Sequence, residues 1–299
     1  MEKYIRMSDG HEVFVRVYEP ETIQGHVHIL HGMAEHSGRY EQFAMFLKQQ
    51  GYYVTMHDHR GHGQTAERNG KYGYFAEEAG FHRVVIDVHE VIQAVRHNKN
   101  LPAVQLIGHS MGSFIARRYI QRYDVANVIL VGTGEGTALH KVGQVVPATI
   151  ATKDEPSALL DKLSFGSFNR TVKNPKTAYD WLCTEANEVQ KYIDDPQCGF
   201  IATTQFYADL MEGITLVSNP AEIAAVRKDL PILLISGSDD PVGGMAKGVF
   251  AVANQFTQAG IQKVCTYIVE GKRHEIMNEA NKLQTYQVML RWLKNETIN

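Results

Sequence analysis

The chain has 299 residues, of which 44% are hydrophobic and 21% are charged, and its formal net charge is −3. These are ordinary values for a globular protein with a substantial core, and dispersed charges of this balance give no electrostatic basis for nucleic acid as a partner. The start of the chain lacks the apolar core of a signal peptide, and no apolar run approaches the ~20 residues of a membrane span. We therefore expect a cytoplasmic protein.

The first twenty residues predict a β-hairpin. Polar and apolar residues alternate on both sides of Asp9 and Gly10, as in EVFVRVY (12–18). Because Asp-Gly favours a tight turn between paired strands, we expect the hairpin to turn at these two residues.

Short apolar runs that end in Gly, Ser, Asp or His recur after the hairpin and predict buried parallel strands. These runs are residues 26–32, 52–59, 103–110, 127–134, 231–240 and 263–271. Helical spacing of apolar residues lies between or after them, at 40–50, 81–98, 111–123 and 281–295. This alternation predicts an α/β fold with a mostly parallel central sheet and helices on both faces.

One long segment interrupts the alternation. From Glu135 to Asp229 no clear buried strand is present, and the sequence turns to helical pieces bounded by proline. We expect residues 1–134 and 230–299 to form the core and residues 135–229 to form an inserted helical cap. The insertion would emerge at the carboxyl ends of the strands, where open α/β sheets bind ligands.

The stretch HDHRGHG (57–63) raises the question of a zinc site, because it holds three histidines and an aspartate. Position 61 is glycine where an H-x-H-x-D-H site needs aspartate, and no H-E-x-x-H motif supplies other ligands. We interpret the stretch as a tight loop, in which Asp58 and Arg60 secure the turn through charge-assisted hydrogen bonds.

The three cysteines, Cys183, Cys198 and Cys265, are widely separated and have no C-x-x-C spacing. They predict neither a disulfide framework nor a cysteine zinc site. We therefore expect no metal and no cofactor.

A serine stands between a predicted strand and a predicted helix. Residues 103–107 run into GHSMG, Gly108 to Gly112, and a helical pattern follows at once. G-x-S-x-G in this context predicts a nucleophile elbow. Ser110 is the candidate nucleophile, and the backbone N–H of Met111 at the helix N-terminus is a candidate oxyanion donor.

A serine nucleophile needs a base and an orienting carboxylate, which follow it in this architecture in the order acid, then histidine. SGSDDPV (236–242) supplies Asp239 and Asp240, and EGKRHEIMNE (270–279) supplies His274. Each residue alone has a plainer explanation, a turn for Asp-Asp-Pro and a structural role for the histidine. Their order, each at a strand end, favours a catalytic triad.

HGMAEHSGRY (31–40) follows the strand that ends at Leu30, in the place of the oxyanion loop of α/β-hydrolases. The N–H of Met33 would be the second oxyanion donor. The alternative is an ordinary turn in which Glu35 and Ser37 only cap the next helix.

These segments together resemble the monoacylglycerol lipase and lysophospholipase family of α/β-hydrolases. HGMAEHSGRY, DHRGHGQT, GHSMGS, SGSDDPV and GKRHEIMNE are similar to that family's motifs in the same order, and DWLCTEANEVQKYIDDPQCGF (180–200) resembles its cap. The resemblance implies Ser110 as nucleophile and His274 as base, and the family's G-x-x-D places the acid at Asp240. The chain departs from the family at Met33, where small residues are common, and at GTGEG (132–136), which is unusually polar.

The resemblance also implies a serine hydrolase that cleaves carboxylic esters of single-chain lipids, with transient contact of the cap with a membrane surface. The cap has more large apolar residues than a surface insertion needs. We expect most of them to pack within the cap and the remainder to line an acyl channel that leads to Ser110: Phe165, Phe168, Phe200, Phe206, Leu210, Met211, Ile214 and Leu216.

Three alternatives stay open. A short-chain carboxylesterase would use the same triad. An aminopeptidase of this fold would need cap carboxylates to hold a free amine, and the candidates are Glu135, Asp154, Glu155 and Asp161. A ligand-binding protein without enzymatic activity is the third alternative.

Overall fold

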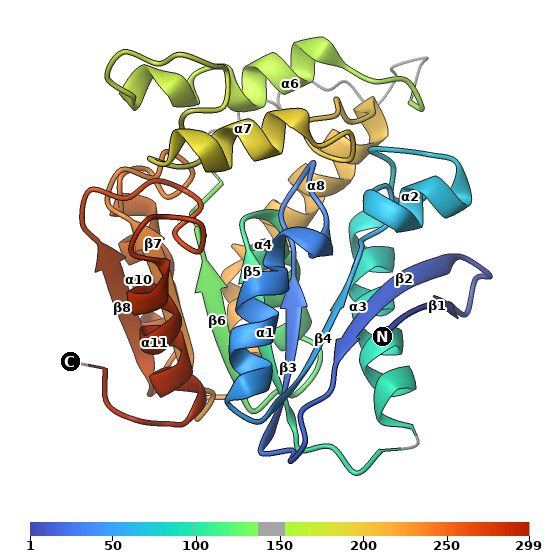
Figure 1. The fold of residues 1–299 in the computed structure, drawn as a ribbon, viewed down its shortest axis with the longest axis vertical. Helices are drawn as coiled ribbons and strands as arrows, with labels where there is room; N and C mark the ends of the chain where they lie inside the picture. Colours follow the sequence, from blue (N-terminus) through green and yellow to red (C-terminus); the bar gives the residue numbers. More distant parts are fainter. Residues whose placement is uncertain (98, 137–152, 299) are drawn as a thin grey trace.

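The computed structural model describes residues 1–97, 99–136 and 153–298, and its centre is an eight-stranded sheet in the order β1-β2-β4-β3-β5-β6-β7-β8 (Figure 1). The strands are β1 (Glu2–Arg6), β2 (Glu12–Tyr18), β3 (Gly25–Leu30), β4 (Tyr52–His57), β5 (Val104–His109), β6 (Asn127–Val131), β7 (Ile232–Gly237) and β8 (Val264–Val269). β2 pairs antiparallel with β1 and β4, and all other pairs are parallel. The predicted mostly parallel sheet is confirmed.

The turn of the N-terminal hairpin is centred one residue earlier in the chain than the Asp-Gly pair predicts. Gly10 N donates to Met7 O at 2.9 Å, so Ser8 and Asp9 occupy the central positions of the turn and Gly10 follows them. The Asp9 carboxylate accepts from its neighbour His11 N at 3.1 Å. Aspartate stabilises turns in this way by bonding to the backbone two residues on, and this bond sets the turn here.

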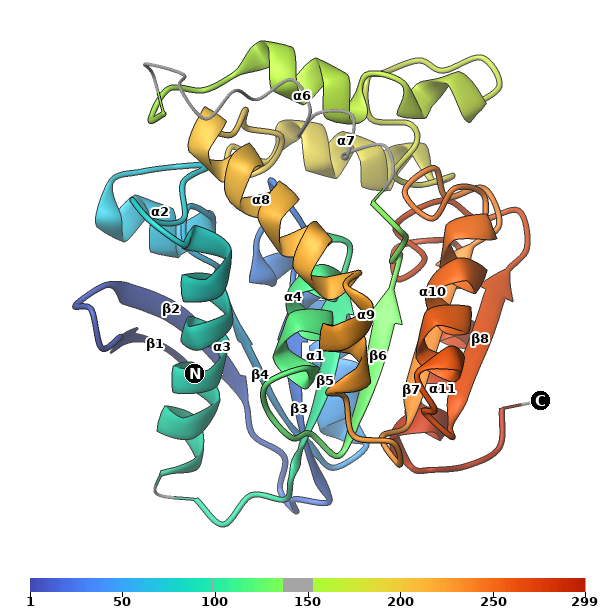
Figure 2. The same cartoon turned by 180° about the vertical axis from the view of Figure 1, so that it is seen from behind.

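Helices cover both faces of the sheet, as predicted, because side chains alternate along each strand. On β5, Leu106 packs with α3 (Gly80–Arg96) and α4 (Met111–Ile120), and Ile107 packs on the opposite face with α1 (Glu41–Gln49) and α11 (Lys282–Leu293). The two views show α1 and α11 on one side and α3, α4 and α10 (Lys247–Gln258) on the other (Figures 1 and 2). A short helix, α2 (Gly63–Asn69), follows the HDHRGHG loop.

The segment between β6 and β7 is helical where the structure describes it, and residues 137–152 lie outside the described part. It contains α6 (Ala158–Phe165), η2 (Phe168–Thr171), α7 (Ala186–Asp194), α8 (Thr204–Val217) and α9 (Pro220–Ala224). α6 and α7 lie across the carboxyl ends of the strands, whereas α8 slopes down beside α4 (Figures 1 and 2). Because α8 shares one hydrophobic cluster with α3, α4 and Leu160 of α6, it packs on the sheet layer as well as against α6.

Residues 175–185 lie in the segment where the sequence predicts helical pieces, but they form turns and irregular backbone instead. The Asp180 carboxylate accepts from Lys176 N at 2.5 Å and from the Thr177 hydroxyl. Short polar side chains that bond to nearby backbone compete with helix formation, so the helix begins only at Ala186.

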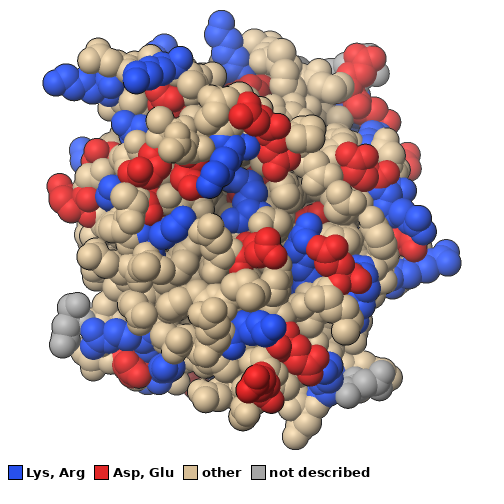
Figure 3. All heavy atoms as spheres, in the orientation of Figure 1, with Lys and Arg blue, Asp and Glu red and all other residues tan. Residues whose placement is uncertain are grey.

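The surface carries mixed charge. On the face shown in Figure 3, basic and acidic side chains are interspersed, and neither sign forms a continuous stripe. Within the described ranges, each helix is too short or too polar to cross a lipid bilayer.

Candidate active site

Ser110 occupies a strained position between β5 and α4. Its φ of 53° and ψ of −119° are unusual for a residue with a side chain. The position is held by hydrogen bonds on both sides, from Ser110 N to Val131 O at 2.9 Å and from Ser113 N to Ser110 O at 2.8 Å. Such strain is found at functional turns, and it places Ser110 immediately before the first residue of α4.

The two glycines of GHSMG allow the backbone to pack closely here. A Cβ on Gly108 would lie 2.2 Å from Gly112 O, and a Cβ on Gly112 would lie 2.3 Å from Leu30 O. Any side chain would therefore push the elbow away from the end of β3, which leads into the loop of residues 31–36.

His274 and Asp240 form a buried pair at the ends of the two last strands. His274 Nδ1 lies 3.0 Å from both carboxylate oxygens of Asp240. Ser236 Oγ and Val242 N also donate to that carboxylate, each at 2.9 Å. The carboxylate therefore holds the Nδ1 proton in place and leaves Nε2 as the basic nitrogen of the ring.

Electrostatics keeps Asp240 ionised in spite of its burial. Burial alone would raise the pKa of the carboxyl group, but the neighbouring His274 and the hydrogen bonds from Ser236 and Val242 outweigh it and hold the pKa below its ordinary value. Asp239 lies differently, because its side chain is exposed and accepts from Ser238 Oγ at 2.8 Å.

The glycine-rich stretch after β6 makes room for this pair. A Cβ on Gly132 would lie 2.9 Å from His274 Cε1 and 3.4 Å from Asp240 Oδ2. Gly132 also has a φ of +59°, which side chains rarely adopt. Position 132 of the GTGEG stretch therefore favours glycine because it lies against His274 and Asp240. The sequence alone did not show this.

A cavity of about 150 Å³ brings predicted residues of the core together. Ser110, His274 and Met33 all line it, and Met111 is buried directly after Ser110 at the start of α4. The segment over the sheet contributes an acid and several apolar or aromatic side chains, namely Asp161, Phe165, Tyr179, Trp181, Leu182, Tyr192 and Phe200. The nucleophile and base candidates therefore share one chamber, whose wall combines apolar, aromatic and acidic side chains.

A buried ionic network supports the loop of residues 31–36, and the sequence did not reveal it. Glu35 Oε1 accepts from Gly32 N at 2.6 Å and from Tyr40 Oη at 2.6 Å. Arg39 Nη1 donates to Glu35 Oε2 at 2.6 Å and to Glu275 Oε1 at 2.5 Å. Glu35 thus does more than cap a helix, because through Arg39 it links this loop to the residue that follows His274.

Charge balance within the network fixes its protonation. Burial opposes ionisation of Glu35, but Arg39 and His109 hold the pKa of that carboxyl well below its ordinary value. Burial likewise disfavours the charged form of His109, yet Glu35 raises the pKa of that imidazole. Since His109 Nε2 also lies 3.3 Å from His274 O, the network connects the elbow to the base.

The HDHRGHG loop lies outside this cavity. His57, His59 and His62 are buried, and none of them is among the described residues that line the chamber. His57 Nε2 lies 3.0 Å from His59 Nδ1, so the rings bond to each other.

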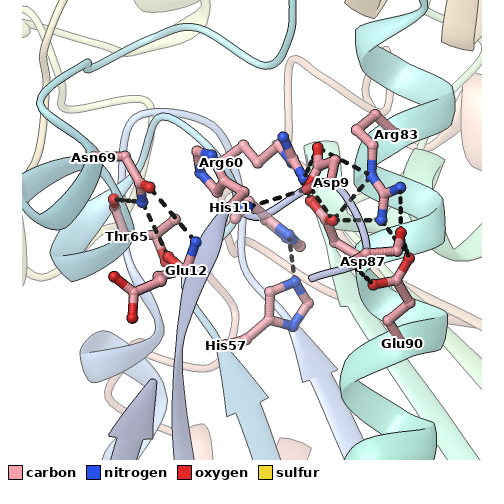
Figure 4. A network of polar contacts seen from close by, with 12 residues as sticks. Asp9, His11, Glu12, His57, Arg60, Thr65, Asn69, Arg83, Asp87 and Glu90 are labelled. Carbon is pink, nitrogen blue, oxygen red and sulfur yellow. Dashed lines mark hydrogen bonds and ion pairs between the residues drawn. The ribbon is translucent and has the colours of Figure 1, made fainter. Parts of the chain in front are cut away.

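The two charged residues of the loop play different parts. Asp58 secures the turn as predicted, since it accepts from Ser37 N and Gln64 N, each at 2.8 Å. Arg60 instead reaches out of the turn to Asp87 on α3 and to Asp9 of the hairpin at 2.7 Å (Figure 4). Arg60 therefore joins three segments of the fold.

The four carboxylates considered for an amine site are dispersed. Asp154 forms a surface ion pair with Lys71 at 3.0 Å, Glu155 is exposed and Glu135 is half-buried. Only Asp161 of these four lines the cavity, where it accepts from Tyr207 Oη at 3.1 Å. Burial raises the pKa of Asp161.

The apolar residues singled out between β6 and β7 divide between lining and packing. Phe165 and Phe200 line the cavity. The rest, apart from half-buried Leu216, pack in the core clusters: Phe168, Phe206, Leu210, Met211 and Ile214.

The chain matches a known family and known proteins over most of its length. Residues 21–281 match the family described as serine aminopeptidase, S33. The monoglyceride lipase of Homo sapiens is 27% identical over 287 residues, which cover 91% of this chain and 82% of that protein. The monoacylglycerol lipase of Mycolicibacterium smegmatis is 27% identical over 288 residues, which cover 95% and 93%.

Solved structures show the same fold. A thermostable carboxyl esterase from Bacillus coagulans in complex with glycerol superposes with a TM-score of 0.92 and 27% identity, covering 99% of this chain and 98% of that one. A soluble variant of monoglyceride lipase from Saccharomyces cerevisiae superposes with a TM-score of 0.75 and 18% identity, covering 99% and 96%. The predicted α/β-hydrolase fold is confirmed.

Proposed function

Because the chain belongs to the serine aminopeptidase S33 family and is a carboxylic ester hydrolase of the monoglyceride lipase type, we propose that Ser110, His274 and Asp240 are its catalytic triad. We further propose that its substrate is an ester with one acyl chain and a small polar head, such as a monoacylglycerol or a lysophospholipid. The observation that carries this proposal is the cavity wall shared by Ser110 and His274, with Asp240 behind the imidazole.

The proposed reaction follows from these positions. His274 Nε2 takes the proton of Ser110 Oγ as the oxygen attacks the ester carbonyl carbon. The N–H groups of Met33 and Met111 stabilise the oxyanion of the tetrahedral intermediate. The intermediate collapses to an acyl-enzyme, and His274 gives its proton to the departing alcohol. Water then attacks the acyl-enzyme with His274 again as base, which releases the acid and restores Ser110.

The proposed substrate class rests on the chamber above Ser110. We propose that residues 135–229 form a cap whose Phe165, Trp181 and Phe200 provide apolar surface for an acyl chain. Each buried methylene would contribute about 0.8 kcal/mol. A small polar head is supported by the related esterase, which is described in complex with glycerol.

The decisive experiment is a series of kcat/KM values over acyl lengths for monoacylglycerol, lysophosphatidylcholine and p-nitrophenyl esters. We expect kcat/KM to rise with chain length to a medium or long optimum, since Phe165, Trp181 and Phe200 line the cavity. A steady fall from acetate upward would contradict the lipid proposal and leave a short-chain carboxylesterase.

Asp161 favours one alternative, an aminopeptidase that holds the free amine of its substrate with a cap carboxylate. The residue lines the same cavity as Ser110. The test compares aminoacyl-naphthylamides with p-nitrophenyl esters for the wild type and Asp161→Asn. Amide cleavage that equals ester cleavage and is lost in Asp161→Asn would favour the aminopeptidase, and Asp154→Asn at the surface is the matched control.

A further inference from the structure

A second group of polar side chains lies where the proposed cap meets the core. His36 follows β3 and precedes η1 (Ser37–Tyr40), whereas Asp195 and Cys198 lie in the turn after α7. One nitrogen, one oxygen and one sulfur of these three residues lie within 4.8 Å of one another. Within residues 1–97, 99–136 and 153–298 this is the only set of three or more His, Cys, Asp or Glu side chains arranged in this way.

The three side chains are accessible and already held together. All three residues are half-buried, so an ion could reach them from solvent. His36 Nε2 lies 2.9 Å from Asp195 Oδ2, and Gln197 N donates to Asp195 Oδ1 at 2.9 Å. Cys198 N donates to Asp195 O at 3.0 Å, which fixes the sulfur on the same turn as the carboxylate.

The surrounding charge favours a cation. The charged groups that act on Cys198 are Arg39, Glu35, Asp195 and Glu275. Arg39 is paired with both Glu35 and Glu275, which offset its charge, and Asp195 places a carboxylate beside His36 and Cys198.

We propose that His36, Asp195 and Cys198 bind a divalent cation of the zinc class at the junction of cap and core. An imidazole, a carboxylate and a thiolate are the ligand types of tetrahedral zinc sites, and water would complete the fourth position. The proposal is independent of the triad, because none of the three residues takes part in the proposed ester cleavage.

Binding requires a defined rearrangement of protons. Gly38 N donates to His36 Nδ1 at 3.2 Å, so the ring proton is on Nε2, facing Asp195. On binding, this proton moves to Nδ1, the Gly38 contact is given up, and Nε2 coordinates the ion. The Cys198 thiol releases one proton to solvent and its sulfur coordinates the ion as thiolate.

The ion would add a link between two segments that already touch. Gly199 N donates to Ala34 O at 2.9 Å, and Tyr192 Oη donates to the same oxygen at 3.0 Å. Ala34 and Gly199 both line the cavity. These hydrogen bonds already hold the wall of the chamber, and a bound ion would add to the stability of the cap against the core.

The test is a titration of the metal-free protein with Cd²⁺, a zinc substitute whose thiolate complex has an ultraviolet charge-transfer band. We expect a band that saturates at one ion per chain in the wild type. Cys198→Ser should lose the band, while Cys265→Ser, which removes the half-buried cysteine on β8, should keep it. His36→Gln and Asp195→Asn should each weaken binding at least ~10-fold, because each removes one ligand.

A thermal melt of each protein with and without Zn²⁺ supplies a second readout. Zinc should raise the melting temperature of the wild type and of Cys265→Ser but not that of Cys198→Ser. Circular dichroism without metal checks that the variants are folded. A band that persists in Cys198→Ser, or a wild type that shows no saturable band, would overturn the proposal.

Discussion

Buried histidines occur in two regions of this protein, and the regions differ in what the imidazoles contact. One region is a histidine row on β3, β4 and the loops that follow them, made of His26, His28, His31, His57, His59 and His62. The other is the cavity wall, where His274 pairs with Asp240 and His109 Nδ1 lies 3.3 Å from Glu35 Oε1. The row has the higher density of metal-binding residue types in the sequence, yet His274 and His109 line the cavity with Ser110.

Within the row the rings bond to one another and to neutral groups. His28 Nε2 lies 3.0 Å from His57 Nδ1, and His28 Nδ1 lies 2.7 Å from Thr55 Oγ1. Burial lowers the pKa of His57 to about 3 and that of His31 to about 4. The row is therefore uncharged at neutral pH and acts as a set of structural hydrogen-bonding groups.

The comparison teaches that a carboxylate partner and access to a cavity set His274 and His109 apart from the row. Of these two, His109 already uses both ring nitrogens, in contacts with Tyr40 Oη and His274 O, so it is a supporting residue. Asp240 can stabilise an imidazolium that forms at His274 during a reaction, whereas protonation of a ring in the row has no such compensation. The number of histidines in a stretch is a poor guide by itself.

The largest expected effect is at the nucleophile of the second region. Ser110→Ala should lower kcat for ester hydrolysis by about 10⁵- to 10⁶-fold, because it removes the attacking oxygen and leaves only the oxyanion donors and binding. The measurements are p-nitrophenyl ester hydrolysis and labelling by a fluorophosphonate probe. Ser113→Ala, one turn along α4, should still be labelled, and label that remains on Ser110→Ala would show that another residue is the nucleophile.

The pairing of His274 is tested by its two neighbouring acids. Asp240→Asn should lower kcat by about 10⁴-fold, because the amide no longer holds the Nδ1 proton or stabilises the imidazolium. Asp239→Asn should change kcat little, since that side chain is exposed. The two variants are compared in kcat/KM under identical conditions, and a larger loss for Asp239→Asn would exchange their proposed roles.

The histidine row should control stability in acid. The pKa of His26 is lowered to about 3, mainly by burial, from an ordinary value of 6.5. Between these values the unfolded chain binds more protons than the folded one, so the free energy of unfolding falls as pH drops from 6.5 towards 3. His26 alone should cost about 2 kcal/mol at pH 5.

Urea unfolding at pH 8 and pH 5 measures this difference. In His26→Gln the loss of unfolding free energy between the two pH values should be about 2 kcal/mol smaller than in the wild type. His82→Gln, on the exposed side of α3, should leave the loss unchanged because that ring is solvated in both states. If the unfolding free energy falls by the same amount in wild type and His26→Gln, burial of uncharged His26 does not lower the stability of the protein in acid.

The smallest expected effect is that of metal removal. Chelators such as EDTA should leave kcat/KM for a p-nitrophenyl ester unchanged, because the proposed reaction uses only Ser110, His274 and Asp240, and the proposed ion at His36 serves the cap. Elemental analysis before and after chelation accompanies the assay. Stoichiometric zinc that is lost together with all activity in Cys198→Ser as well, which lacks a ligand of the proposed site, would restore the histidine row as a candidate metal centre.

The sequence by itself determined the parts of the protein that depend on local patterns. Apolar runs and helical spacing predicted the strands and most of the helices, because burial on one or both faces imposes these periods. GHSMG predicted the elbow for a similar reason, since a Cβ on Gly108 or Gly112 would lie only 2.2 or 2.3 Å from a backbone oxygen. The family resemblance rested on several such local motifs in order.

Only the tertiary structure decided which distant groups meet. The pairing of Asp240 rather than Asp239 with His274 depends on how the loops after β7 and β8 turn, and these residues are 34 positions apart. Arg39 and Glu275 are 236 positions apart, and His36 and Asp195 are 159 apart. Contacts of this kind leave no periodic trace in the sequence, because they arise when the sheet brings separate loops to the same edge.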